Sequence, residues 1–288
     1  QGTNPNAASS SVGKWAPANL KGLATGISHS ANGFSSAWMS LLGTALLAVG
    51  LKTAFHTMAF IAAGLCFIGG TLMLKPEFKA GEANVTAKDA DESTQTYRGL
   101  LKTKTFWLIF AINALCLIGG GSVFSQCAMI AQVQAGWKGG YILVVILALS
   151  NGGGRILYNG LSDKIGVYKG YTVMFIAAII GMVTLFFATN IPLLIIGVVL
   201  VGSAFGGANA MLYAVNAHEF GTKALGKAHG ATVIGYLFNG FLGSTIAGIS
   251  LDKTGSYSIA YIFGIAALIV SIILVQVLKK NHVDVVEA

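Results

Sequence analysis

One arginine in a long apolar stretch is the residue whose chemistry most needs explaining. Arg155 lies in the run from Tyr141 to Tyr158, eight residues before Asp163, a distance of about 12 Å along a helix. Such a charge in the middle of a bilayer costs roughly 2.5 to 3.5 kcal/mol and persists where it faces a cavity or a partner. A guanidinium binds a carboxylate through two parallel hydrogen bonds. The sequence therefore predicts that Arg155 anchors an anionic ligand.

Two neighbours on the same helical face offer further hydrogen bonds to that ligand. Asn151 precedes Arg155 by four residues and Tyr158 follows it by three, spacings that bring side chains together on a helix. Two alternative roles for the arginine stay open. It could bind carbonyl groups exposed by a broken helix beside the glycines at 152–154, or reach for lipid head groups, which is strained over that distance.

A short motif occurs twice and suggests an internal repeat. The sequence Asn-Gly-Phe begins at Asn32 in the first apolar run and again at Asn239 in the seventh, six runs later. His29 lies one turn before Asn32, and Tyr236 one turn before Asn239. Parallel repeats of six helices place a substrate site between two halves, so these four side chains are further candidates. His29 is a candidate proton carrier because imidazole titrates near neutral pH, although a hydrogen bond between helices explains it as well.

The sequence contains none of the common motifs for enzymatic catalysis or metal binding. It has no HExxH, no phosphate-binding P-loop, no G-x-S-x-G turn and no pair of carboxylates within an apolar run. The three cysteines lie in apolar stretches without metal-ligand spacing. His218 and Glu219 are interpreted as two adjacent polar residues in a loop, without further ligands nearby in the sequence. We therefore expect no catalytic residue, no metal, no cofactor and no enzymatic activity.

The elements that position these residues are membrane-spanning helices. Of the 288 residues 55% are hydrophobic and 10% are charged, too few charges to cover a water-facing surface. The basic residues form no stripe with aromatic residues, so nucleic acid is not an expected partner, whereas the lipid bilayer is. The long apolar runs do not alternate with period two, which argues against a β-barrel. Eight runs predict an all-α, polytopic helical bundle: 23–49, 54–74, 106–124, 141–158, 171–189, 193–216, 230–251 and 258–278.

The distribution of basic residues predicts the orientation. Eight spans divide the remaining segments into two alternating sets, one with fourteen Lys and Arg residues and one with three, Lys52, Lys138 and Lys253. Basic loops stay in the cytoplasm, so both ends and the hydrophilic segment near residues 75–104 are expected there. The prediction is a multi-pass protein of the plasma membrane with a cytoplasmic C-terminus.

The loop after the fourth span resembles the signature loop of the major facilitator superfamily. Asp163, Lys164, Gly166 and Lys169 match its pattern, while Asn159 stands at the position of its first glycine. In that family the loop packs against a neighbouring helix end and helps to govern the inward and outward states. The resemblance implies a gating role for Asp163, Lys164 and Gly166.

Segments 14–26, with Trp15 and Pro17, and 219–227 resemble the loops before the fifth and eleventh helices of that superfamily. Segments 14–26 and 252–257 also resemble its oxalate/formate antiporter group. The resemblance maps the eight spans onto helices five to twelve of a twelve-helix transporter, with the first helices missing. It implies three parts: residues 1–74 as a remnant of the N-terminal half, 75–104 as a cytoplasmic linker, and 105–288 as the C-terminal six-helix half.

The function implied is secondary active transport of a small organic anion by alternating access, coupled to protons or to a counter-anion. Oxalate exchangers of this type use a lysine on the eleventh helix, but none occurs between Lys227 and Lys253. A single cation favours a monocarboxylate and places oxalate in doubt. Two alternatives remain: transport of a neutral or phosphorylated solute with Arg155 structural, and a truncated membrane protein that does not transport.

Overall fold

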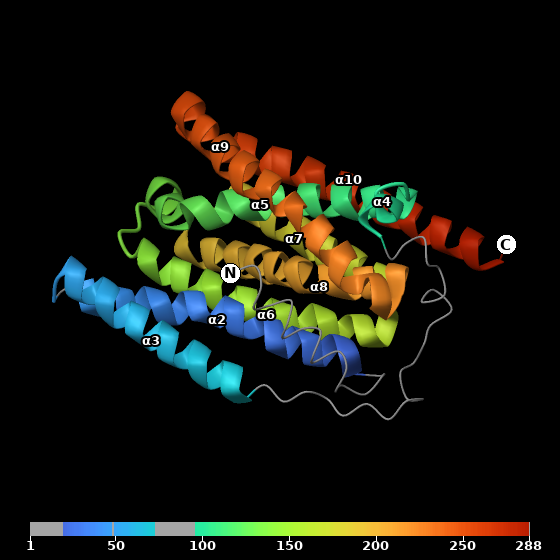
Figure 1. Ribbon diagram of the computed structural model, residues 1–288. Coiled ribbons are helices and arrows are strands. Elements are labelled where there is room, and N and C mark those ends of the chain that lie inside the picture. Colours follow the sequence, from blue (N-terminus) through green and yellow to red (C-terminus); the bar gives the residue numbers. More distant parts are fainter. Residues whose placement is uncertain (1–19, 48, 73–95, 288) are drawn as a thin grey trace.

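The computed structural model describes residues 20–47, 49–72 and 96–287, and this part of the chain is helical with short connections (Figure 1). The helices are α2 (Lys21–Leu47), α3 (Leu51–Leu72), α4 (Tyr97–Leu100), α5 (Lys104–Ala135), α6 (Gly140–Ile165), α7 (Val167–Phe187), α8 (Ile191–Thr232), the 3₁₀ turn η4 (Val233–Gly235), α9 (Tyr236–Thr254) and α10 (Ser258–Glu287).

Local sequence explains where several helices begin and end. The side chain of Thr103 accepts a hydrogen bond from the backbone N–H of Phe106 and starts α5, and Asn190 caps α8 in the same way through Leu193. Such caps satisfy N–H groups that have no partner within the helix. Gly136 and Gly255 end α5 and α9 with positive φ angles of 61° and 63°, which favour glycine.

Seven helices of the described chain are long and apolar enough to cross a bilayer. Five of them are α3, α5, α6, α7 and α10. The other two are Ile191–Gly221, the first part of α8, and Lys223–Thr254, which joins the end of α8 to α9. The 27-residue α2 is not among the seven because polar residues such as His29, Ser30 and Asn32 lower its hydropathy. Large apolar side chains, Phe60 and Phe187 among them, are exposed on the outer surface, as expected for helices that face lipid.

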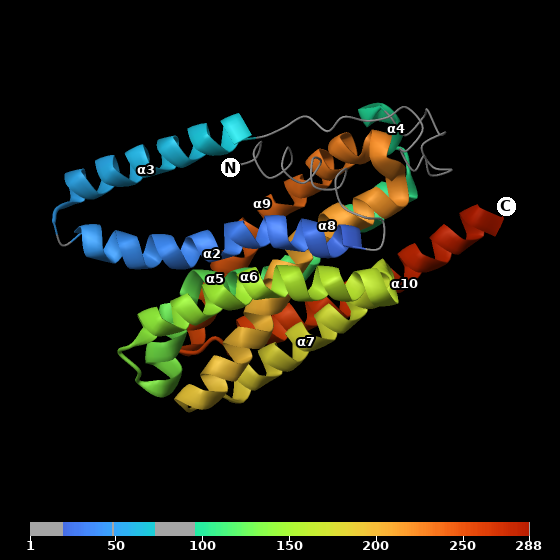
Figure 2. The same cartoon turned by 90° about the horizontal axis from the view of Figure 1, so that it is seen from below.

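The helices lie roughly side by side in a bundle. α8 packs against both α6 and α7, α5 packs against α9 and α10, and α2 lies along α6 (Figures 1 and 2). α3 contacts α2 at the edge of the bundle, and its apolar residues are mostly exposed. Both views place the beginning of α2, the end of α6 and the end of α10 at the same end of the bundle.

Glycines bring α2 and α6 into backbone contact. A Cβ atom on Gly26 would lie 2.5 Å from the backbone oxygen of Arg155, and one on Gly33 would lie 2.6 Å from Cα of Gly152. Only glycine fits at such distances, and small residues at regular spacing let membrane helices approach closely. Gly202 and Gly207 pack α8 tightly in the same way, against Leu147 and Tyr158 of α6.

The prediction of an all-α membrane bundle is confirmed, and each predicted span coincides with a helix, the seventh being assembled from the end of α8, η4 and α9. One local interpretation is wrong. His218 and Glu219 do not lie in a loop, because α8 continues through them to a break at Gly221, where φ is 71° and ψ is −179°. The segment 14–19 with Trp15 and Pro17, and residues 73–95 of the linker, lie outside the described residues.

Candidate functional site

Arg155 is buried at the contact between α2 and α6, with a relative exposure of 6%. Its Nη1 donates a hydrogen bond to the backbone carbonyl of His29 at 3.1 Å, and its Nε donates to Oδ1 of Asn151 at 3.0 Å. The residue lies ten positions before Ile165, the end of α6, or about 15 Å along the helix axis. The guanidinium is therefore held in place deep within the bundle.

No carboxylate neutralises this charge within the described part of the chain. The ion pairs found there join Glu219 to His218 and to His282, and neither involves Arg155. A guanidinium has five N–H donors, and the two bonds to His29 and Asn151 use two of them. The other three have no hydrogen-bond partner among the described residues, so the side chain retains a capacity for further bonds.

The close contact of the two helices explains how Arg155 reaches a backbone carbonyl. Gly26 and Gly33 lie one turn on either side of His29 and remove the side chains that would hold α2 away from α6. The His29 carbonyl then lies within reach of the guanidinium across the contact. A carbonyl group of the continuous helix α2 thus holds the arginine and does not use all of its N–H donors.

A row of rings continues from His29 toward α8. The His29 ring lies 6.3 Å from that of Tyr213 between centroids, and Tyr213 lies 5.5 Å from His229. Nδ1 of His229 is buried without a hydrogen-bond partner in the described structure. Sequence reasoning missed Tyr213 and His229. Both are polar residues in or beside the sixth and seventh predicted spans, which could have marked them as candidates. Their distance from His29 in the sequence gives no indication that the three rings lie close together.

The other predicted binding residues do not all join Arg155. Tyr158 points at α8, where its hydroxyl lies 3.5 Å from that of Ser203. Tyr236 donates to the backbone carbonyl of Asn209 at 3.3 Å. Asn239 is buried against Gly121 of α5, and the Asn32 side chain is exposed. The structure thus brings together Arg155, Asn151 and His29, whereas Tyr158 and Tyr236 bind α8, Asn239 packs against α5 and Asn32 is exposed.

The residues of the predicted gate lie at the end of α6. The Asp163 carboxylate accepts hydrogen bonds from the backbone N–H groups of Gly22 at 2.9 Å and of Leu23 at 2.8 Å, at the beginning of α2. A negative charge at a helix N-terminus is favourable because N–H groups without helical partners point toward it. Lys164 is exposed, and Gly166 joins α6 to α7 with a φ of 87° that favours glycine.

Two small, mainly apolar cavities lie among α5, α7, α8 and α10, and neither is lined by Arg155. The arginine and the Asp163 contact lie instead along α2 and α6. Arg155 is the buried cation and Asp163 caps the beginning of α2. Both lie along the contact between α2 and α6, which glycines line.

Comparison with known proteins identifies the family. The model of the Major Facilitator Superfamily matches the chain over residues 1–166 and again over 129–286. The chain belongs to the Major Facilitator Superfamily. It is accordingly a multi-pass membrane protein of a transporter family, as the resemblance of the 152–170 segment implied.

Two curated relatives have similar sequences. The uncharacterized transporter YhjX of Escherichia coli is 26% identical over 230 residues, which are 77% of this chain and 56% of that protein. The oxalate:formate antiporter of Oxalobacter formigenes is 24% identical over 249 residues, 83% of this chain and 58% of that protein. The chain thus spans little more than half the length of these relatives.

Solved structures share the fold. The transporter FucP in its outward conformation superposes with a TM-score of 0.73 at 12% identity, covering 95% of this chain and 72% of FucP. A variant of the same Escherichia coli fucose:proton symporter gives 0.70 at 14% identity, with 95% and 73% covered. The bundle of transmembrane helices is therefore that of a major facilitator transporter.

Proposed function

We propose that this chain is part of a secondary active transporter that moves a small organic anion by alternating access, with Arg155 as the anion anchor. The observation that carries the proposal is a buried guanidinium with no described carboxylate partner and three N–H donors left over. Such a group gains most from a mobile anion, because a planar carboxylate can accept two parallel charge-assisted hydrogen bonds.

The number of cations argues for a monoanion. Arg155 is the one Lys or Arg within the predicted spans, and α9 carries no basic residue between its start at Tyr236 and Lys253. Among these residues a second negative charge on the solute would have no second basic side chain beside it, and burial of an unpaired charge is costly. Formate or lactate therefore suits this half-site better than oxalate, although a relative is named as an oxalate:formate antiporter.

The hydrogen bonds of Asp163 support a role in gating. They hold the beginning of α2 against the end of α6, at the end of the bundle that the basic residues predict to be cytoplasmic. Opening this end requires the two backbone N–H groups to leave the carboxylate. The described conformation, with this contact made, is then closed on the cytoplasmic side.

Coupling and location complete the proposal. The transporter resides in the plasma membrane with its C-terminus in the cytoplasm, and it exchanges its anion for another or takes it up with protons. His29 is the candidate proton carrier, because its backbone bonds to Arg155 and its ring lies beside Tyr213. A charge change on that ring would act on the guanidinium directly.

A second function has support from the same site. The bond from Arg155 to the His29 carbonyl fastens α6 to α2, and the bond to Asn151 within α6 orients the guanidinium, as in a structural arginine. In that case the solute is neutral or phosphorylated. Loss of the arginine then destabilises the protein but does not reduce the uptake of anions selectively. The two functions make different predictions for competition by uncharged analogues.

The test is counterflow into liposomes that contain the full-length protein, with labelled formate, lactate, oxalate and a sugar phosphate in turn. We expect Arg155→Gln to reduce uptake of the transported anion at least about 100-fold, and Arg155→Lys to restore part of it, since a lysine keeps the charge but not the planar fork. Arg98→Gln is the matched control, because this arginine is exposed on α4.

Unchanged anion uptake in Arg155→Gln would show that the anchor is assigned wrongly. Stronger competition by uncharged analogues than by anions would favour the second function with a neutral solute, and uptake of the sugar phosphate that Arg155→Gln leaves unchanged would favour it with a phosphorylated one. Thermal unfolding of each variant in detergent separates a lost binding site from a lost fold.

A further inference from the structure

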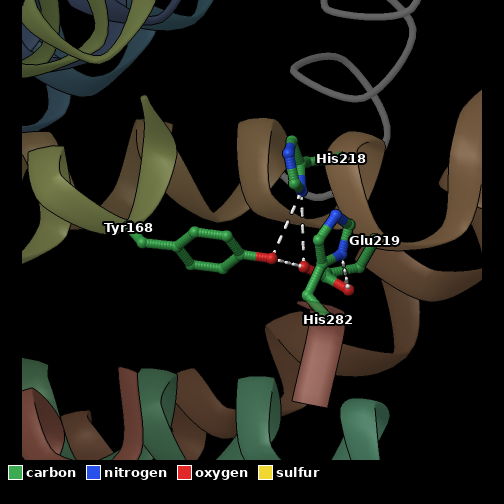
Figure 3. A network of polar contacts seen from close by, with 4 residues as sticks. All are labelled: Tyr168, His218, Glu219 and His282. Atoms are coloured by element: carbon green, nitrogen blue, oxygen red, sulfur yellow. Dashed lines mark hydrogen bonds and ion pairs between the residues drawn. The ribbon is translucent and has the colours of Figure 1, made fainter. Parts of the chain in front are cut away.

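Four polar side chains meet at the ends of three helices, away from Arg155 (Figure 3). His218 and Glu219 lie near the break of α8, His282 lies near the end of α10, and Tyr168 lies in the first turn of α7. Nδ1 of His218 is 3.3 Å from one carboxylate oxygen of Glu219, and Nδ1 of His282 is 3.2 Å from the other. Tyr168 donates a hydrogen bond to the same carboxylate.

The fold explains why residues so distant in sequence converge. The chain turns at Gly221, where a positive φ of 71° favours glycine, and this break lies two residues after Glu219. α10 has 30 residues and is about 45 Å long, more than the roughly 30 Å that a bilayer core requires. The extra turns carry His282 past the apolar part of the helix and up to Glu219.

We propose that His218, Glu219 and His282 form a binding site for a divalent transition-metal ion of the zinc type. Two imidazole nitrogens and a carboxylate are a ligand set that zinc binds in proteins, with a fourth position left for water. The three ligand atoms lie within 4.8 Å of one another. Nδ1 of His218 and Nδ1 of His282 lie 3.3 and 3.2 Å from different oxygens of the Glu219 carboxylate. Neighbouring ligands of a tetrahedral ion are about 3.3 Å apart when each lies about 2.0 to 2.1 Å from the ion, so both nitrogens are within reach of an ion bound to this carboxylate.

The surroundings suit an ion that enters from water. The Glu219 side chain is 4% exposed, whereas those of His218 and His282 are 39% and 19% exposed. The carboxylate is thus fixed by burial and by Tyr168, and the histidines form the open side of the site. An outer hydrogen bond that orients a ligating carboxylate is usual at metal sites. The ion would tie the ends of α7, α8 and α10 together.

The experiment measures metal binding to the full chain, purified with an affinity tag that contains no histidine. We expect one equivalent of Co²⁺ to bind with the visible absorption of a four-coordinate ion and to be displaced by Zn²⁺ but not by Mg²⁺. Glu219→Gln and His282→Ala should each weaken binding at least about 10-fold. His56→Ala is the matched control, because His56 is exposed on α3, and it should bind like the unmodified chain.

Two results would overturn the proposal. One is Co²⁺ binding that His282→Ala leaves unchanged or that His56→Ala removes. The other needs no variant and so survives a folding defect: if Zn²⁺ does not raise the thermal unfolding midpoint of the unmodified chain over that in excess chelator, the cluster holds no ion. These measurements do not depend on transport, so their outcome is independent of the proposed function.

Discussion

At the scale of single residues, Asp163 joins two helices through two hydrogen bonds to backbone N–H groups. A carboxylate at a helix N-terminus contributes about 0.5 to 2 kcal/mol, so its loss should shift the balance between closed and open states without unfolding the protein. We predict that Asp163→Ala lowers the initial rate of counterflow by about 2- to 30-fold, the factor that corresponds to this free energy. Asp252→Asn, an exposed carboxylate at the end of α9, should leave the rate within about twofold.

The same variant should open the cytoplasmic end. A cysteine introduced as Leu23→Cys should react with maleimide faster when Asp163 is alanine, because the beginning of α2 is then released from α6. Equal labelling rates in the two backgrounds would contradict a gating role.

Residue chemistry was predictable only in part. Arg155 could be singled out because a lone charge in an apolar run has a large energetic cost. Its bond to the His29 carbonyl could not, since every residue has a carbonyl and sequence does not say which one faces another helix. The partnership of Glu219 with His282 was missed for the same reason: 63 residues separate them, and no spacing rule joins the ends of two helices.

At the scale of the elements, the contact between α2 and α6 depends on missing side chains. A methyl group on Gly26 would meet the backbone oxygen of Arg155 at 2.5 Å, and backbone cannot move aside cheaply. We predict that Gly26→Ala destabilises the protein by about 1 to 3 kcal/mol, the usual cost of overpacking. The measurement is thermal unfolding of the purified protein in detergent.

A matched control lies on α3, where a Cβ on Gly64 would have open space around it. Gly64→Ala should be neutral or slightly stabilising, since alanine favours a helix over glycine by about 1 kcal/mol. Equal effects at Gly26 and Gly64 would show that the close contact is not what stabilises α2 against α6.

Helix positions were the most predictable feature, because long apolar runs leave few alternatives in a membrane. The break at Gly221 was not foreseen: the surrounding residues 217–227 are polar enough to suggest a loop, yet they continue as helix on both sides of one glycine.

At the scale of the whole molecule, the charges of the connecting segments predict an orientation that can be tested directly. In a background with the three cysteines replaced by serine, Lys253→Cys should react with a membrane-impermeant maleimide on intact cells, since this residue lies in the basic-poor set. Lys169→Cys should react only after permeabilisation. Both lysines are exposed in the structure, so access through the protein does not limit either reaction.

Labelling in the reverse pattern would place Asp163 on the outer side and invert the proposed gate. The division of the chain into 1–74, 75–104 and 105–288 stays a prediction, because residues 73–95 lie outside the described part.

The backbone contact at Gly33 and Gly152 restricts the route a solute can take. With so little room between the two helices, no molecule can pass through the seam they form. If Arg155 anchors the solute as proposed, the solute must approach from a side of α6 other than its contact with α2. Substitutions on that side of α6 could then change which solutes are accepted, without altering the contact between α2 and α6.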